Sequence, residues 1–104
     1  MKRPLRIGRE AQAEMTIAAA WYEAQRVGLG HDFLDMVDRA LRRIELAPRP
    51  GSLVPGVPDH DIQRVPVRRF PFHIVYVELP DRIQVLAVAH QRRRPGYWNS
   101  RIPD

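Results

Sequence analysis

The hydrophobic positions of this chain follow a helical period in its first half and a strand period in its second half. Within residues 10–27, and again within residues 31–47, apolar side chains recur at steps of three and four, which is typical of amphipathic helices. The first stripe consists of Ala11, Met15, Ala18 and Tyr22 with Trp21 alongside, and the second of Phe33, Val37, Leu41 and Ile44, widened by Leu34, Met36 and Ala40. We expect both stripes, with Trp21 and Tyr22, to face a core.

Glycines and a proline mark where the two helices end. Gly28-Leu29-Gly30 separates the helices, and glycine readily takes the positive φ that the end of a helix often needs. Pro48 ends the second helix, because proline lacks the amide hydrogen that a helix interior requires. The connection between the helices is so short that they should form an antiparallel hairpin.

Three strand-like segments occupy the second half of the chain. They are rich in apolar and β-branched residues, and they cover residues 62–67, 72–79 and 82–90. A tight turn at Pro80-Asp81 joins the last two, which we expect to be buried on much of both faces, with Tyr76 packed inside. Pro66 has no amide hydrogen for a strand ladder, so we expect the first segment to be interrupted or at an edge.

These elements predict a single α+β domain that spans residues 1–104. A short strand over residues 5–8 comes first, the helical hairpin follows, and the three strands come last, after a proline-rich loop over residues 48–61. The predicted architecture is a helical hairpin packed on a small antiparallel sheet, in the order β-α-α-β-β-β, with a basic and aromatic C-terminal tail.

The positive charge of the chain is carried almost wholly by arginine. The 104 residues have a formal net charge of +5, with 16 arginines against one lysine. Guanidinium groups bind phosphate and carboxylate through a planar fork, so this composition suits an anionic partner. A genome-wide preference for arginine codons explains the general bias equally well, but it does not explain a local cluster.

Composition also excludes several kinds of site and location. The sequence has no cysteine, which excludes disulfides and thiolate metal sites. We expect no metal and no cofactor, since no metal-ligand spacing is formed by His31, Asp59, His60 and Asp61. No segment approaches the ~20 apolar residues of a membrane span, and the basic N-terminus lacks the apolar region of a signal peptide. We therefore expect a cytoplasmic protein without a membrane partner.

The exit of the last strand is the strongest candidate site. His90 ends the apolar strand, Arg92-Arg93-Arg94 follow, and Tyr97 and Trp98 lie just beyond. Guanidinium groups beside flat rings suit a phosphate-rich or acidic partner. The plainer alternatives are a solvated strand exit for the arginines and a structural hydrogen bond for His90.

Together these motifs resemble the RelE/ParE toxin superfamily of bacterial plasmid-stabilisation proteins. Each motif is weak alone, but their order agrees with the superfamily over nearly the whole chain. The resemblance is carried by Trp21-Tyr22-Glu23, Gly28-Leu29-Gly30 ahead of Phe33-Leu34, Arg69-Phe70-Pro71-Phe72-His73-Ile74-Val75-Tyr76, residues 83–90, and Arg92-Arg93-Arg94-Pro95-Gly96-Tyr97-Trp98-Asn99-Ser100-Arg101.

The resemblance implies the toxin of a type II toxin–antitoxin pair. Its partner would be a small acidic antitoxin whose disordered segment wraps the toxin, which a net charge of +5 favours. Operator DNA would be reached only through the antitoxin. RelE-like members of the superfamily cut mRNA on the ribosome, whereas ParE-like members inhibit DNA gyrase.

The residues favour the ParE-like branch. Cleavage of mRNA needs groups that deprotonate the 2′-hydroxyl, stabilise the phosphate and protonate the leaving oxygen. The positions that resemble the motif of RelE-like nucleases are only partly kept. This chain has His73 for an arginine, Arg64 and Pro66 near two lysines, Gln91 or Arg92 near the C-terminal arginine, and Tyr97 near the tyrosine. Arg64, His73, Arg92 and Tyr97 would serve a nuclease, but Pro66 supplies neither a proton nor a charge.

We therefore expect a toxin that inhibits DNA gyrase by binding, with no favoured catalytic residue. A ribosome-dependent mRNA endoribonuclease is the alternative, and a member that has lost its toxicity is a third possibility. The residues expected to contact the target or the antitoxin are Arg64, Arg69, His90, Arg92, Arg93, Arg94, Tyr97, Trp98 and Arg101.

Overall fold

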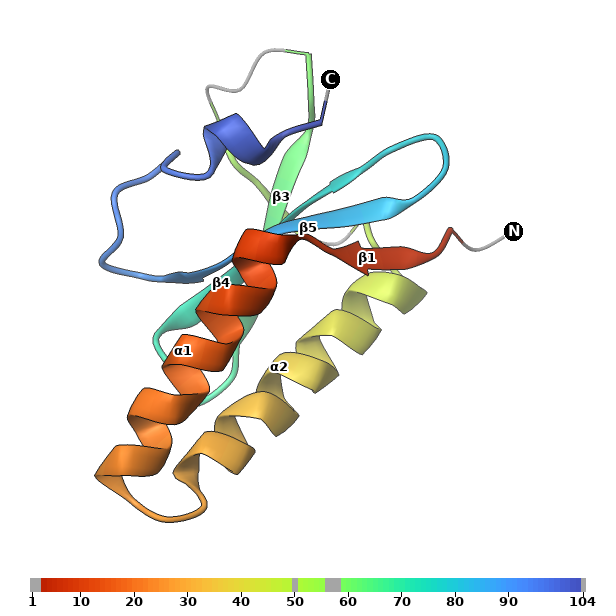
Figure 1. Ribbon diagram of the computed structural model, residues 1–104. Coiled ribbons are helices and arrows are strands. Elements are labelled where there is room, and N and C mark those ends of the chain that lie inside the picture. The colour runs from red at the N-terminus through yellow and green to blue at the C-terminus, as the bar shows by residue number, and fades with distance from the viewer. Residues whose placement is uncertain (1–2, 50, 56–58, 104) are drawn as a thin grey trace.

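The computed structural model describes residues 3–49, 51–55 and 59–103, and it has a helical layer on a sheet layer (Figure 1). The predicted α+β class and the predicted order of elements are confirmed. The elements are β1 (Leu5–Ile7), α1 (Arg9–Gln25), α2 (Leu29–Leu46), β2 (Ser52–Leu53), β3 (Ile62–Val67), β4 (Phe72–Glu78), β5 (Ile83–His90) and a 3-10 helix η1 (Asn99–Arg101). The two-residue β2 lies inside the segment 48–61 that was predicted to be a loop, so it was not predicted.

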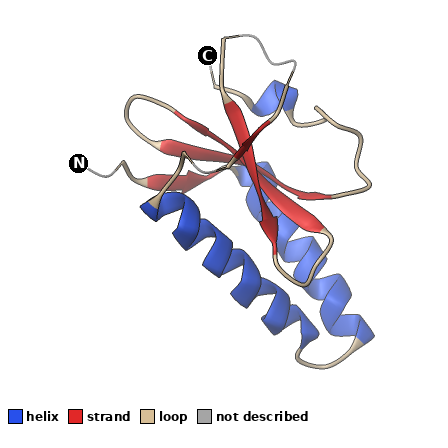
Figure 2. Ribbon diagram, turned by 180° about the vertical axis from the view of Figure 1, so that it is seen from behind, coloured by secondary structure: helices blue, strands red, loops and turns tan. Residues whose placement is uncertain are grey.

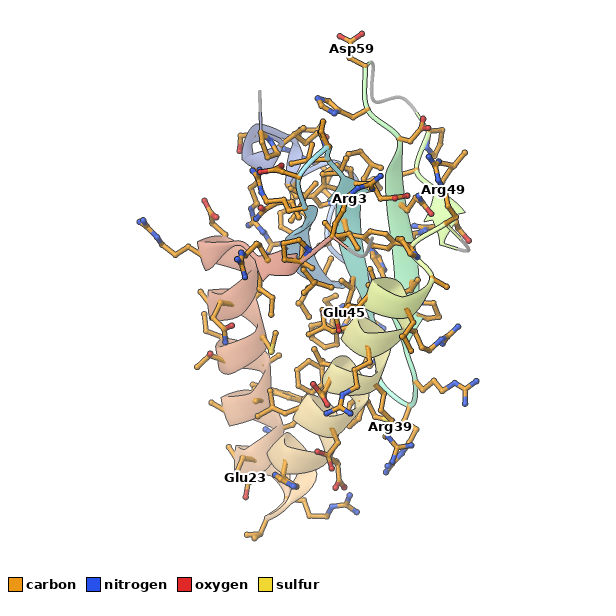
Figure 3. The ribbon with its side chains drawn as sticks, turned by 90° about the vertical axis from the view of Figure 1, so that its right-hand side faces the viewer. Arg3, Glu23, Arg39, Glu45, Arg49 and Asp59 are labelled. Carbon is orange, nitrogen blue, oxygen red and sulfur yellow. The ribbon has the colours of Figure 1, made fainter. Side chains whose placement is uncertain are left out.

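The helical hairpin is closed by one carboxylate and two glycines. Gly28 has a φ of 91°, in the left-handed region that favours glycine. Glu23, which Figure 3 labels at this end of the hairpin, accepts hydrogen bonds from the amides of Gly28 at 2.9 Å and Gly30 at 3.0 Å. The Gly28 amide is the main cause that lowers the pKa of Glu23. A Cβ at Gly30 would collide with the carbonyl of Ala19, so glycine also lets the helices approach closely.

The sheet is mixed, with the strand order β1-β5-β4-β3-β2 (Figure 2). Strands β3, β4 and β5 pair antiparallel as expected, and β1 joins β5 in parallel, with Leu5 opposite Ile83. Strand β2 pairs with Gln63 and Arg64 of β3. In the described part of the chain Pro66 therefore lies on a free edge, which confirms the expectation drawn from its missing amide hydrogen.

The larger core lies between the hairpin and the sheet. Helix α1 contacts β5, and α2 contacts β3. Phe33 is fully buried, and its ring lies about 5 Å from those of Tyr22, Phe70 and Phe72. Tyr76 is fully buried too, as predicted, and its hydroxyl donates to the carbonyl of Pro48 at 2.5 Å.

The prediction that Trp21 faces the core is wrong. Its side chain is 59% exposed, whereas the neighbouring Tyr22 is half-buried and packs on the core. The ring of Trp21 lies at the flank of the apolar stripe of α1, beyond the part that α2 and the sheet cover. It contacts Tyr22 edge-on at 5.2 Å and is otherwise open to a groove described below.

A smaller cluster covers the other face of the sheet. The C-terminal segment crosses this face, and Trp98 and Ile102 pack against the strands there; the strands lie between the helical hairpin and η1 (Figure 2). The buried residues of this cluster are Ile62, Val75, Val77, Leu86, Ala87, Ala89 and Trp98. In the predicted loop over 48–61, Pro50, Gly56 and Pro58 lie outside the described residues.

Candidate binding surface

Two turns that carry arginine meet at one end of the sheet. The amide of Gln91, just after β5, donates to the carbonyl of Pro71 in the β3–β4 turn at 2.8 Å. Arg69 in that turn has a φ of 73°, a left-handed conformation that is uncommon for residues other than glycine. The structure therefore brings Arg69 close in space to the arginine run that begins at Arg92, as a shared binding surface requires.

The arginine run is exposed and partly ordered by local contacts. Arg92, Arg93 and Arg94 are exposed, and within the described residues none of them forms an ion pair. The guanidinium of Arg93 lies over the ring of Tyr97 at 4.0 Å, a cation–π contact that fixes its position. The amide of Arg92 donates to Nδ1 of His90 at 3.0 Å, so the His90 ring has a structural role at the strand exit.

Glu14 of α1, which sequence reasoning missed, organises the C-terminal segment. Its carboxylate accepts the hydroxyl of Tyr97 at 2.7 Å and pairs with the guanidinium of Arg101 at 3.0 and 3.2 Å. It also accepts the amide of Val88 at 3.1 Å. Burial, and then the hydrogen bond to Glu14, raises the pKa of Tyr97 well above its ordinary value, so this phenol keeps its proton.

Glu14 and Arg101 also close an open edge of the sheet. Within the described residues, strand β1 pairs with β5 at Ile83, Gln84 and Val85. Beyond that point the Val88 amide is taken by Glu14, and the carbonyl of Leu86 accepts Arg101 at 3.0 Å. Charged side chains therefore occupy backbone groups that another strand would otherwise pair with.

Two residues of the predicted contact set are placed inside the molecule. Trp98 is only 3% exposed and belongs to the cluster on the far face of the sheet. The guanidinium of Arg101 donates hydrogen bonds to the carboxylate of Glu14 and to the backbone carbonyl of Leu86. Neither side chain is available to a partner in this structure. Trp98 packs on the apolar far face of the sheet, and Arg101 binds at the edge of β5.

The structure places three of the four candidate nuclease residues, Arg64, His73 and Tyr97, in two different settings. In the sheet, His73 lies opposite Pro66 and Arg64 lies opposite Val75, so these side chains share one face. Burial, and then the nearby charge of Arg64, lowers the pKa of His73. The hydroxyl of Tyr97, by contrast, is bound to Glu14 on α1.

A largely apolar groove of about 380 Å³ lies between α1 and the end of β5. Ile17 and Trp21 are 69% and 59% exposed on its α1 side, and His90, Arg93 and Tyr97 line its other side. Exposed apolar side chains gathered in one groove indicate a binding site for a protein partner. The sequence held a signal for it, because Ile17 and Trp21 widen the apolar surface of α1 beyond the stripe.

The described residues offer neither a cluster of metal ligands nor a membrane-spanning helix. In residues 3–49, 51–55 and 59–103 no three His, Asp or Glu side chains are arranged to hold a metal ion. Within the same residues neither helix has an apolar stretch long enough to cross a membrane. The arrangement of exposed arginines beside an apolar groove is suited to binding a macromolecule.

Comparison with known proteins identifies the family. The model for the ParE toxin of the type II toxin–antitoxin system, parDE, matches residues 5–95. The chain belongs to this family. The predicted place in the RelE/ParE superfamily, on the ParE side, is thereby confirmed, and the chain is a ParE-type toxin of the type II class.

The fold agrees with that of a solved ParE-type system. One chain of the chromosomal ParDE TA system from P. aeruginosa superposes with a TM-score of 0.73 over 86% of this chain and 96% of that chain. The identity is 16%, so this similarity concerns the fold. No curated protein matches the chain in sequence.

Proposed function

We propose that this ParE-type toxin inhibits DNA gyrase by binding to it, in the cytoplasm, and that a small acidic antitoxin neutralises it. The proposal rests above all on the family match over residues 5–95. The arrangement of the alternative nuclease residues supports the same choice. Pro66 offers no proton or charge, and Tyr97 is held by Glu14 with a raised pKa, which disfavours both proton donation to a leaving oxygen and formation of a phenolate base.

The groove along α1 is the proposed seat of the antitoxin. An amphipathic acidic segment would bury Ile17 and Trp21 with its apolar face and place its carboxylates near Arg93 and the exposed arginines beside it. Attraction between a chain of net charge +5 and an acidic partner also speeds their encounter. Arg69, Arg92 and Arg94 lie at the same end of the sheet and are proposed to contact the target or the antitoxin.

Expression of the chain without its antitoxin tests the target. Gyrase inhibition predicts filamentous cells, a DNA-damage response and DNA breaks that depend on gyrase, and the purified chain should inhibit supercoiling by purified gyrase. Immediate translation arrest with mRNA cuts at the ribosomal A site would instead establish the nuclease alternative. Normal growth with folded protein would indicate a member that has lost toxicity.

Trp21→Ala tests the antitoxin groove. A central aromatic anchor contributes about 2 kcal/mol or more to binding, so we expect antitoxin affinity to fall roughly 30-fold or more. Folding should be nearly unchanged, because the ring is 59% exposed. The matched control is Val27→Ala, which removes a 91% exposed side chain that does not line the groove. Equal antitoxin affinity of the two variants would refute this location.

The arginine run has its own test. Replacement of Arg92, Arg93 and Arg94 by alanine should leave the fold intact, because all three are exposed, and should weaken gyrase inhibition or antitoxin binding. A triple variant that folds, remains fully toxic and binds its antitoxin normally would remove these residues from the site.

A further inference from the structure

Three arginines line a second hollow, on the α2 side of the molecule. Arg39 and Arg43 lie one helical turn apart on α2, and Arg68 follows directly after β3. With Met36, Ala40 and Pro66 they line a hollow of about 160 Å³. Figure 3 shows Arg39 on the outer side of α2.

The positive charge of this arginine hollow is not neutralised locally. Within the described residues Arg39, Arg43 and Arg68 form no ion pair, and no carboxylate lines the hollow. The nearby Arg42 differs, because its guanidinium is paired with Asp38 at 3.1 Å. Three guanidiniums without an ion pair, carried by a helix and an adjoining turn around one hollow, suit the binding of anions.

The lining of the hollow favours a nucleic acid over a protein. Among the described residues, none of the exposed large hydrophobic side chains lines it, whereas Ile17 and Trp21 line the groove on α1. Protein interfaces usually have an apolar centre, but contacts to a phosphate backbone are carried mainly by arginine and lysine. We propose that the arginine hollow binds the phosphate backbone of duplex DNA. The choice of duplex DNA rests on the proposed function, since gyrase acts on that substrate.

The arginine hollow and the groove are separate surfaces. In the part of the chain that the structure describes they share no lining residue, and they involve different helices, α2 and α1. Variants of the hollow can therefore be made without changing the groove, and DNA contact by the toxin goes beyond the expectation that it reaches DNA only through a partner.

Salt-dependent binding of the full chain to a fluorescent DNA duplex tests the proposal. Arg39, Arg43 and Arg68 are replaced together by glutamine. Loss of three phosphate contacts should make the slope of log K against log salt shallower by about 2.7. The drop in the binding constant K between about 50 and 200 mM salt should therefore be roughly 40-fold smaller than for the native chain. Binding at the lower salt concentration should weaken by roughly tenfold or more.

The matched control replaces Arg6, Arg9 and Arg26 by glutamine, which removes the same charge from exposed positions outside the hollow that form no ion pair within the described residues. We expect this control to retain most of the affinity and salt slope. Equal losses in both triple variants, or native DNA binding by the hollow variant, would overturn the proposal. So would a hollow variant that loses binding to single-stranded RNA or polyglutamate while keeping duplex DNA. Gyrase is absent from this assay, so its outcome is independent of a separate supercoiling test of the proposed function.

Discussion

The two faces of the sheet are covered in different ways. One face is covered by the hairpin of α1 and α2, whose apolar stripes supply Phe33 and the aromatic residues around it. The other is covered by the irregular C-terminal segment, which contributes Trp98 and the partly buried Ile102. The helices cover the sheet with side chains that repeat at helical spacing. The C-terminal segment is instead held by a few individual contacts, chiefly those of Glu14 with Arg101 and Tyr97.

This difference separates global stability from the placement of the binding surface. The hairpin face carries the main core, so its loss should unfold the whole domain. The C-terminal face carries the segment that presents Arg93 and Tyr97 to the groove. Damage there should release the segment before the domain unfolds, because few long-range contacts hold it.

The largest expected effect comes from Phe33→Ala. The ring is fully buried among Tyr22, Phe70 and Phe72, and its removal leaves a cavity, so we expect a loss of about 4 kcal/mol in the free energy of unfolding. Urea unfolding monitored by circular dichroism measures it. Leu34→Ala on the same helix, where the side chain is 39% exposed, is the control and should cost less than half as much.

Trp98→Ala should cost somewhat less, about 3 kcal/mol, because the C-terminal segment can move to fill part of the space. Hydrogen exchange should increase mainly in residues 91–103, with strands β3 and β4 still protected. Trp98→Phe, which keeps an aromatic ring, is the comparison and should restore most of the protection. Uniform loss of protection across the sheet would show that the two faces do not differ as argued.

Glu14→Gln should cost about 2 kcal/mol, because it removes the charge that pairs with Arg101 in a mostly buried position. The amide oxygen still accepts one hydrogen bond, so the effect is smaller than that of losing Trp98. Thermal unfolding measures the stability, and antitoxin affinity should fall along with it, since Tyr97 loses its anchor. Glu10→Gln, at an exposed position on the same helix, is the control.

The smallest expected effect is a pH dependence from His73. Burial and the charge of Arg64 lower its pKa in the folded state below the ordinary value of 6.5. As the pH falls, the unfolded chain therefore binds a proton at His73 before the folded chain does. The contribution of the neutral ring to the free energy of unfolding is thus complete above about pH 6.5 and is lost as the pH falls through the folded pKa. His73→Gln should reduce the fall in melting temperature on acidification, and His31→Gln, at an exposed position, should not. An unchanged fall in His73→Gln would contradict this assignment.

Much of the fold was predictable because it depends on neighbouring residues. The apolar stripes of both helices, the glycines that close the hairpin and the β-branched strands are local signals, and observed element ends lie within two residues of the predicted ones. The edge position of Pro66 followed from its missing amide hydrogen. The family was likewise predictable, since its motifs lie in order along the chain.

The binding surface was only partly predictable. The sequence indicated the arginine run and its neighbouring aromatic residues, but it placed Trp21 in the core and Trp98 on the surface. The structure reverses the two environments. Both are large apolar side chains, and which of them is buried depends on whether a distant segment covers it.

The sequence by itself determined the elements, their order, the family and the basic character of this toxin, because these depend on residue type and on spacing along the chain. The tertiary structure decided which arginines remain available for a partner. Arg101 is bound to Glu14, 87 residues away in the chain, whereas Arg93 lies over the nearby Tyr97 and stays exposed. Ion pairs and burial of this kind depend on distances in space, and such distances arise only when the helical hairpin, the sheet and the C-terminal segment pack together.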